Sequence, residues 1–207
     1  MNVLLLHAWP PNERMWEPQL PAIRELGHEP VAPRLYGRGP SIDGWAAQLL
    51  GEVAGPLVVV GASMGGYCAL ALARRAPERV VGIVLVGSKP TADTDERRRF
   101  RDETAAQLRS DGVPPDFDAD VSAEEYAVAQ EAMRDRADLT GVVSSFGGPL
   151  LVCVGDADEI VSVEEARATA AGALLGSLEL FEDAGHLLSI EQPERFNAVL
   201  TEFLSRF

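Results

Sequence analysis

The residue of this sequence that is best placed to do chemistry is Ser63, in the run GASMGG at residues 61–66. An apolar, β-branched run precedes it at residues 57–60, and an Ala- and Leu-rich run of helical spacing follows it to residue 75. A serine at a strand-to-helix turn, with a glycine two positions away on each side, is typical of a nucleophile elbow. The alternative is a glycine-rich turn that cradles a phosphate, but this run lacks the lysine and the glycine spacing of phosphate-binding loops.

The spacing of this elbow has a physical cause. The turn is so tight that Ser63 must adopt a strained backbone conformation, which projects its hydroxyl from the edge of the sheet. Gly61 and Gly65 leave room for the neighbouring strand and helix, with which larger side chains would collide. The amide of Met64 lies at the start of the helix, where unpaired N–H groups and the helix dipole favour a developing anion. The elbow thus places a hydroxyl beside an anion-stabilising amide.

A serine hydroxyl is a weak nucleophile at neutral pH and needs a base, which a buried acid orients. The sequence has three histidines. His186 follows the last apolar strand in a loop with Gly185, so its ring can reach over the carboxyl edge of the sheet. His28 lies at a helix-to-strand connection, where a surface role explains it best. His7 ends the first strand, where a histidine more often braces a loop by hydrogen bonds. We therefore predict that His186 is the base.

The acid should follow the penultimate apolar strand, where the loop GDADEIVS occupies residues 155–162. A tight turn through Gly155 leaves Asp158 best placed to aim inward, whereas Asp156 is better placed to cap the turn. A solvated acidic loop is the alternative for the whole cluster. We predict that Asp158 is the acid, and Asp156 remains the second candidate.

The elements that must position these residues alternate along the chain. Apolar runs predict strands at residues 2–6, 29–33, 57–60, 80–86, 149–154 and 178–181. Runs of helical spacing predict helices at residues 16–26, 42–53, 64–75, 163–171 and 193–207. Such alternation is typical of an α/β fold whose parallel strands are joined by right-handed crossovers. We therefore predict one α/β domain over residues 1–207, with a predominantly parallel sheet of about six strands flanked by helices.

The alternation breaks between residues 88 and 148, where the chain is polar and charged. Two amphipathic helical stretches, around residues 93–110 and 123–137, are separated by a glycine and two prolines. The insertion follows the carboxyl end of a strand, the edge where α/β proteins bind ligands. We predict a helical lid over residues 91–148; the alternative is a solvated surface excursion.

Composition excludes several classes of partner. The net charge of −14 argues against nucleic acids and anionic membrane surfaces. The two cysteines lie in apolar patterns, which indicate neither a disulfide framework nor a zinc site and fit a reducing compartment. The N-terminal run lacks the basic region and cleavage site of a signal peptide, and no apolar run reaches the ~18 residues of a membrane span. We expect a cytoplasmic protein without a bound metal.

Four motifs, in the order in which they occur, resemble the α/β-hydrolase superfamily, in particular its serine esterases and lipases. The resemblance covers nearly the whole chain outside residues 93–134. The four motifs are HAWPPNERMWEPQLPAIRELG, GASMGGYCALALARRAPERVVGIVLVGS, VCVGDADEIVS and DAGHLLSIEQPERFNAVLTEFL.

The resemblance implies a triad of Ser63, His186 and Asp158, with an oxyanion hole formed by the backbone amides of Trp9 and Met64. It implies neither a metal nor an organic cofactor. The expected reaction is hydrolysis of a small ester, thioester or lactone through an acyl-enzyme on Ser63. The alternatives are a perhydrolase, lyase or acyltransferase of the same fold, or a catalytically silent member that binds a ligand.

The expected partner is a small-molecule acyl substrate, and the protein is expected to be a monomer or a homodimer. An apolar acyl pocket is predicted at Trp9, Phe100, Tyr126 and Leu187. For Phe100 and Tyr126, packing of the lid against the body is the alternative.

Three features depart from the family pattern. Ala8 follows His7 where the family has glycine, which puts a methyl group on the oxyanion loop. Arg34 stands where an acidic residue usually precedes R-G-x-G, which alters the support of that loop. The chain begins at the oxyanion strand, without the family's first hairpin, and the lid segment is short. We therefore expect an open, shallow site for small or extended substrates.

Overall fold

A six-stranded, wholly parallel sheet forms the centre of the molecule, which the computed structural model describes from residue 1 to residue 207. The strands lie in the order β2-β1-β3-β4-β5-β6, and every neighbouring pair is parallel. This arrangement confirms the predicted fold class and the six strands. The strands are β1 (Asn2–Leu6), β2 (Glu29–Val31), β3 (Leu57–Ala62), β4 (Val80–Val86), β5 (Pro149–Gly155) and β6 (Leu175–Phe181).

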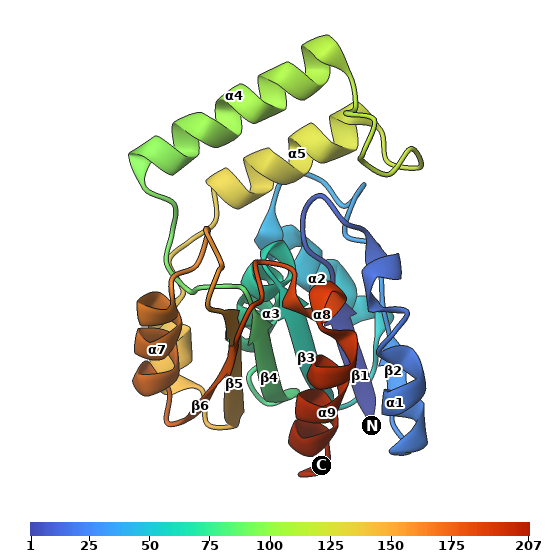
Figure 1. The fold of residues 1–207 in the computed structure, drawn as a ribbon, viewed down its shortest axis with the longest axis vertical. Helices are drawn as coiled ribbons and strands as arrows, with labels where there is room; N and C mark the ends of the chain where they lie inside the picture. Colours follow the sequence, from blue (N-terminus) through green and yellow to red (C-terminus); the bar gives the residue numbers. More distant parts are fainter.

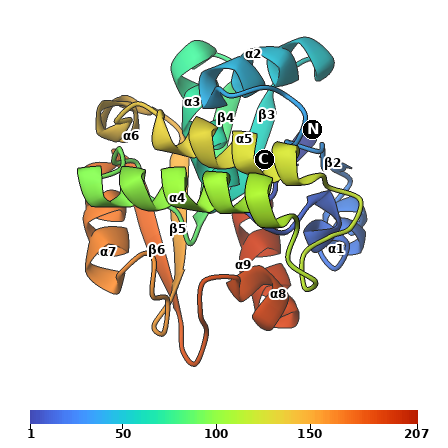
Figure 2. The ribbon, with the colours of Figure 1, turned by 90° about the horizontal axis from the view of Figure 1, so that it is seen from above.

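Helices cover both faces of this sheet, as the view from above shows (Figure 2). One face packs against α2 (Ile42–Glu52), α3 (Met64–Arg75), α6 (Thr140–Ser145) and α7 (Val163–Gly172). The other face packs against the 3-10 helix η1 (Glu13–Trp16), α1 (Leu20–Glu25), α8 (Leu188–Glu191) and α9 (Pro193–Leu204).

The central strand β3 shows why the apolar runs are continuous. Val59 packs into one hydrophobic core, while Val58 and Val60 pack into the core on the opposite face. Successive side chains of a strand point to opposite faces, and both faces are covered here, so every position is apolar.

Two helices stand over the carboxyl edge of the sheet (Figure 1). They are α4 (Asp95–Asp111) and α5 (Ala123–Arg134), which pack against each other, and we call them the helical hairpin. Thr94 and Ser122 cap their N-termini by accepting hydrogen bonds from backbone amides. The third helix of the inserted segment, α6, was not expected; it packs against α3 and α7 beside the sheet.

Two predicted elements differ in the structure. The helix expected over residues 16–26 begins only at Leu20, because Pro18 lies in the turn after η1 and cannot supply a helical amide. Pro21 lies in the first turn of α1, where no amide donor is needed. The last strand begins at Leu175 rather than at residue 178. Its first three residues are exposed at the sheet edge and carry no apolar alternation, so the sequence pattern did not indicate them. None of the helices combines the length and apolar character needed to cross a bilayer.

Candidate active site

Ser63 lies at the turn between β3 and α3, with φ 47° and ψ −109°. This backbone conformation costs on the order of 1–3 kcal/mol for a non-glycine residue and persists only where surrounding contacts hold it. The Ser63 N–H donates to the carbonyl of Val86 at 2.8 Å, and its carbonyl accepts from the Ser88 hydroxyl at 2.8 Å. Both backbone groups of the strained residue are therefore fixed by the segment at and just after the end of β4.

The glycines of the turn are required by close backbone approach. A Cβ at Gly61 would collide with the backbone of Gly65, and a Cβ at Gly65 would collide with the backbone of Leu6. The next glycine, Gly66, lies against the Ser88 side chain in the same way. The crowding expected from the sequence is thus present in the structure.

The structure brings Ser63, His186 and Asp158 together in one hydrogen-bonded chain. The Ser63 Oγ lies 2.9 Å from Nε2 of His186. Nδ1 of the same ring lies 3.0 Å and 2.9 Å from the two carboxylate oxygens of Asp158. The Asp158 carboxylate accepts at Nδ1, so the ring carries its proton there and leaves Nε2 to accept from the serine hydroxyl.

Asp158 is held by more than the histidine. Its side chain is fully buried, and one carboxylate oxygen accepts from the amides of Ile160 at 2.8 Å and Val161 at 3.0 Å. Burial opposes ionisation, but the hydrogen bonds from His186 and these amides outweigh it and lower the pKa of Asp158. Asp156 is exposed and its carboxylate makes no hydrogen bond. Of the two candidate acids, Asp158 is the one that contacts the ring.

The predicted oxyanion donors lie on two different elements. Met64 is the first residue of α3, where an amide has no acceptor within its own helix. Trp9 follows β1, and its backbone N–H donates to no acceptor in the protein. Their assignment to an oxyanion hole remains a prediction.

His7 braces the loop that carries Trp9. Its Nδ1 lies 2.8 Å from the carbonyl of Ala8, and its Nε2 accepts from the amide of Leu35 at 2.9 Å. Complete burial lowers the pKa of His7 to about 4, so the ring is neutral near pH 7. His7 therefore has a structural place, and neither ring nitrogen is free to take the serine proton.

The departures at Ala8 and Arg34 are accommodated. The Ala8 methyl is buried in the core beside Met15, whose sulfur accepts from the Ala8 amide at 3.2 Å. Arg34 donates to the carbonyl of Asp120 at 2.6 Å and lies 3.5 Å from the Glu125 carboxylate. The loop after β2 is thereby tied to the loop that joins α4 and α5 and to the first turn of α5.

Two pockets border the helical hairpin. One, of about 440 Å³, is lined by Trp9, Leu108 and Phe117 among others, and we call it the tryptophan pocket. The other, of about 570 Å³, is lined by Tyr67, Arg97 and other residues near the start of α4, and we call it the arginine pocket.

The four predicted pocket residues do not share one pocket. Trp9 lines the tryptophan pocket, whereas Phe100 is half exposed and lines the arginine pocket. Tyr126 is completely buried, with its ring against Trp9 and other aromatic rings, so it supports the wall instead of facing a ligand. Leu187 packs against the core beside α9.

Two residues that hold the site were not identified from the sequence. Gly87 has φ 53°, and a Cβ there would lie 2.8 Å from the His186 carbonyl and 3.2 Å from an Asp158 carboxylate oxygen. Ser88 is completely buried and bonds to Ser63 as described above. The pair directly follows the apolar run of β4. This position, at the same carboxyl edge as Ser63, is the sequence feature that could have identified both residues.

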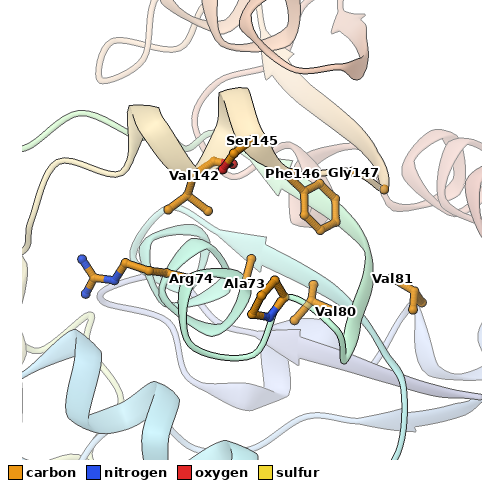
Figure 3. A pocket seen from close by; sticks show the side chains of 10 residues that line it. Ala73, Arg74, Val80, Val81, Val142, Ser145, Phe146 and Gly147 are labelled. Carbon is orange, nitrogen blue, oxygen red and sulfur yellow. Dashed lines mark hydrogen bonds between the residues drawn. The ribbon is translucent and has the colours of Figure 1, made fainter.

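A further cavity of about 460 Å³ lies away from this site (Figure 3). It is bounded by the end of α3, the first residues of β4 and the end of α6, including Ala73, Val80 and Phe146. Val80 begins β4, so the cavity lies at the opposite sheet edge from Gly87. No cluster of three or more His, Cys, Asp or Glu side chains is arranged to hold a metal ion.

The fold and the Ser–His–Asp geometry agree with the family comparison. Residues 3–199 match the model of the alpha/beta hydrolase family, and the chain therefore belongs to that family. The predicted family, and its standing as a family of enzymes, are confirmed.

The individual relatives match this chain at low identity or over only part of their length. The chain is 39% identical over 95 residues to a pimeloyl-[acyl-carrier protein] methyl ester esterase of Aromatoleum aromaticum, covering 43% of this chain and 38% of that protein. It is 29% identical to the dihydrolipoyllysine-residue acetyltransferase component of an acetoin cleaving system of Cupriavidus necator, over 86% of this chain and 54% of that protein. These matches thus span well under two thirds of each curated relative.

Among solved structures, a thermophilic esterase from Thermogutta terrifontis with malate bound superposes with a TM-score of 0.91. The two proteins are 27% identical, and the match covers all of this chain and 90% of the esterase chain.

Proposed function

We propose that this protein is a serine hydrolase that cleaves a small ester, thioester or lactone through an acyl-enzyme on Ser63. The observation that carries the proposal is the continuous hydrogen-bonded chain from Ser63 Oγ through His186 to Asp158. Membership of the alpha/beta hydrolase family and the similarity to two esterases support it.

In the first half-reaction, the Ser63 oxygen attacks the substrate carbonyl carbon while His186 Nε2 takes the hydroxyl proton. The carbonyl oxygen becomes an oxyanion, which the amides of Trp9 and Met64 stabilise by hydrogen bonds. His186 then donates its proton to the departing alcohol or thiol, and the acyl group stays on Ser63. In the second half-reaction, water attacks the acyl-enzyme, with His186 again as base and then as acid.

Asp158 keeps the base in the productive tautomer. Its lowered pKa means that the carboxylate is ionised in the working range, so it accepts from Nδ1 and stabilises the imidazolium that forms in each half-reaction. The amides of Ile160 and Val161 hold the carboxylate in place, so the ring needs no reorientation as it gains and loses the proton.

The tryptophan pocket is the proposed place for the apolar part of the substrate. Trp9 links it directly to the oxyanion loop, and Leu108 and Phe117 supply apolar walls. In this proposal the helical hairpin acts as the lid that closes the site from above, as predicted for residues 91–148.

A panel of esters, thioesters and lactones of increasing acyl length tests the proposal. The wild-type protein should show saturable hydrolysis of at least one class, and Ser63→Ala should lower kcat about a millionfold. A rate that is unchanged by Ser63→Ala, or no turnover of any class, would contradict the proposal.

A further inference from the structure

A buried cluster of charged side chains lies at the arginine pocket, and Asp93 and Arg101 of this cluster line it. The Asp93 carboxylate pairs with both Arg101 and Arg136, and all three side chains are at most 5% exposed. Arg136 also stacks on the ring of Tyr67, with its guanidinium carbon 3.9 Å from the ring centroid. One buried carboxylate between two buried guanidiniums leaves an excess positive charge, which is costly unless another anion compensates it.

Three donor groups of this pocket have no hydrogen-bond partner in the protein. Nη2 of Arg101 makes no hydrogen bond, although Nε and Nη1 of the same group do. The hydroxyl of Tyr67 and the guanidinium of Arg97 also make none, and both residues line the pocket. Burial and the nearby charge of Arg101 both lower the pKa of Arg97, because each disfavours its charged form. An anion placed beside Arg97 would favour the charged form again.

The acidic residues of the pocket do not cancel this charge. Glu165 is already paired with Lys89 at 2.6 Å. Glu96 and Glu159 are exposed at the rim, where water and salt screen their charges. The pocket therefore combines the buried Arg101 and the partly buried Arg97 with exposed acidic residues, in a protein whose overall charge is −14.

The pocket adjoins the proposed site. Tyr67 is four residues beyond Ser63 on α3, which is about one turn or 6 Å along the helix. Glu159 and Ile160, which also line the pocket, directly follow Asp158. The strand order places this pocket beside β4 and β5, whereas Trp9 follows β1 on the other side of β3. The two pockets therefore lie on opposite sides of the strand that leads to Ser63.

We propose that the arginine pocket binds a carboxylate carried by the substrate, so that the enzyme prefers half-esters of dicarboxylic acids to neutral esters of the same length. The proposal rests on the proposed function, since it assigns a substrate class to that same site. Arg97, Arg101 and Tyr67 are the specificity-determining residues. The guanidinium of Arg97 stacks over the ring of Phe100 and has no hydrogen-bond partner in the protein, so its N–H groups are free to donate to the carboxylate.

Matched ester pairs test this preference. Monomethyl succinate, glutarate and adipate are compared with methyl butyrate, pentanoate and hexanoate by kcat/KM in a pH-stat. A second set carries the carboxylate on the alcohol side, which distinguishes the end of the substrate that enters the pocket. A hydrogen bond to a charged group contributes about 1.5–3 kcal/mol, so at least one charged ester should exceed its neutral partner about tenfold or more. Equal kcat/KM values across all pairs would overturn the inference.

Two arginines of α4 supply a matched comparison. Arg97→Gln should reduce the charged-to-neutral ratio of kcat/KM about tenfold. Arg99→Gln removes the same charge from an exposed position on the same helix that has no ion pair, and it should leave the ratio unchanged. A ratio that falls equally in both variants would attribute the preference to the general field of the helix and overturn the assignment to this pocket.

Binding to an inactive variant separates this inference from the proposed function. Glutarate binding to Ser63→Ala, measured by calorimetry, should weaken about tenfold when Arg97→Gln is added. Glutarate binding that depends on Arg97 without any ester hydrolysis would uphold the pocket and remove the hydrolase proposal. Hydrolysis of neutral esters without glutarate binding would uphold the hydrolase proposal and overturn the assignment of a carboxylate to the arginine pocket.

Discussion

Asp156 and Asp158 stand two positions apart in one loop, but their surroundings give them different chemistry. The Asp158 carboxylate is fully buried and has three donors, whereas the Asp156 carboxylate is exposed and has none. A buried carboxylate with donors at fixed positions can hold an imidazole in one orientation, which a solvated carboxylate cannot do.

Replacing each aspartate by asparagine tests this difference. Asp158→Asn should lower kcat about ten-thousandfold, because an amide favours the wrong tautomer of His186 while leaving the shape intact. Asp156→Asn is the matched control and should stay within a few-fold of wild type. Steady-state kinetics on the best ester of the panel gives both values, and the opposite ranking would reassign the acid.

Burial of His7 should make the folded protein less stable at acid pH. The unfolded imidazole takes a proton with a pKa near 6.5, and the folded one with a pKa of about 4. Between pH 4 and pH 6.5 the folded state therefore binds fewer protons than the unfolded state. The contribution of His7 to the free energy of unfolding is complete above pH 6.5 and declines as the pH falls toward 4. The loss amounts to about 2–3 kcal/mol by pH 4.5.

Urea denaturation of wild type and His7→Asn at pH 7 and pH 4.5 measures that loss. The wild-type protein should lose about 2–3 kcal/mol more between the two pH values than the variant does. Equal losses would mean that His7 does not stay neutral on folding.

Among the elements, the turn after β4 has the most consequence for the site. Ser88 holds the backbone of Ser63, and Gly87 leaves space for the ring of His186. Gly87 donates its amide to the carbonyl of Cys153 at 2.9 Å, which fixes the turn to β5. We therefore regard both as positioning residues.

Gly87→Ala should lower kcat by one to two orders of magnitude with a smaller effect on KM, because the methyl group would displace His186 from Ser63. Gly27→Ala is the control, since Gly27 also has a positive φ but no atom within 4 Å of its Cβ position. Each variant should lose about 1–2 kcal/mol of stability from backbone strain. Loss of activity in both to the same extent would assign the effect to strain alone.

The joint between the helical hairpin and the body depends on a buried carboxylate. Asp93→Asn would leave Arg101 and Arg136 as uncompensated buried charges and should cost about 3–5 kcal/mol. Asp43→Asn removes an exposed partner of Arg74 and should cost about 1 kcal/mol or less. Chemical denaturation of the two variants compares them, and equal costs would contradict the burial argument.

At the scale of the whole molecule, the parallel sheet is what assembles the site. Ser63 and His186 are 123 residues apart in the chain, and Asp158 and His186 are 28 apart. They meet because β3, β5 and β6 all end at the same edge, and the loops that follow these strands reach over it (Figure 1).

The sheet and the three central side chains were predictable because each depends on a local pattern: a continuous apolar strand, or a residue type just after its carboxyl end. Gly87 and Ser88 were not, because their role is defined by what the strand order places beside them. The four pocket residues could not be assigned to one pocket for the same reason, since helical spacing cannot tell that Tyr126 packs among aromatic rings while Phe100 lines a different pocket from Trp9. The helix expected from residue 16 begins only at Leu20, after a turn that contains Pro18, because apolar spacing alone does not fix where a helix starts.

Labelling of the intact protein with a fluorophosphonate tests the central claim most directly, because the reagent reacts with a serine only when a base and an oxyanion hole activate it. We expect one adduct per chain, mapped by peptide mass spectrometry to Ser63 and strongly reduced by His186→Asn. Failure to label across several probe sizes, or an adduct on any other residue, would contradict it.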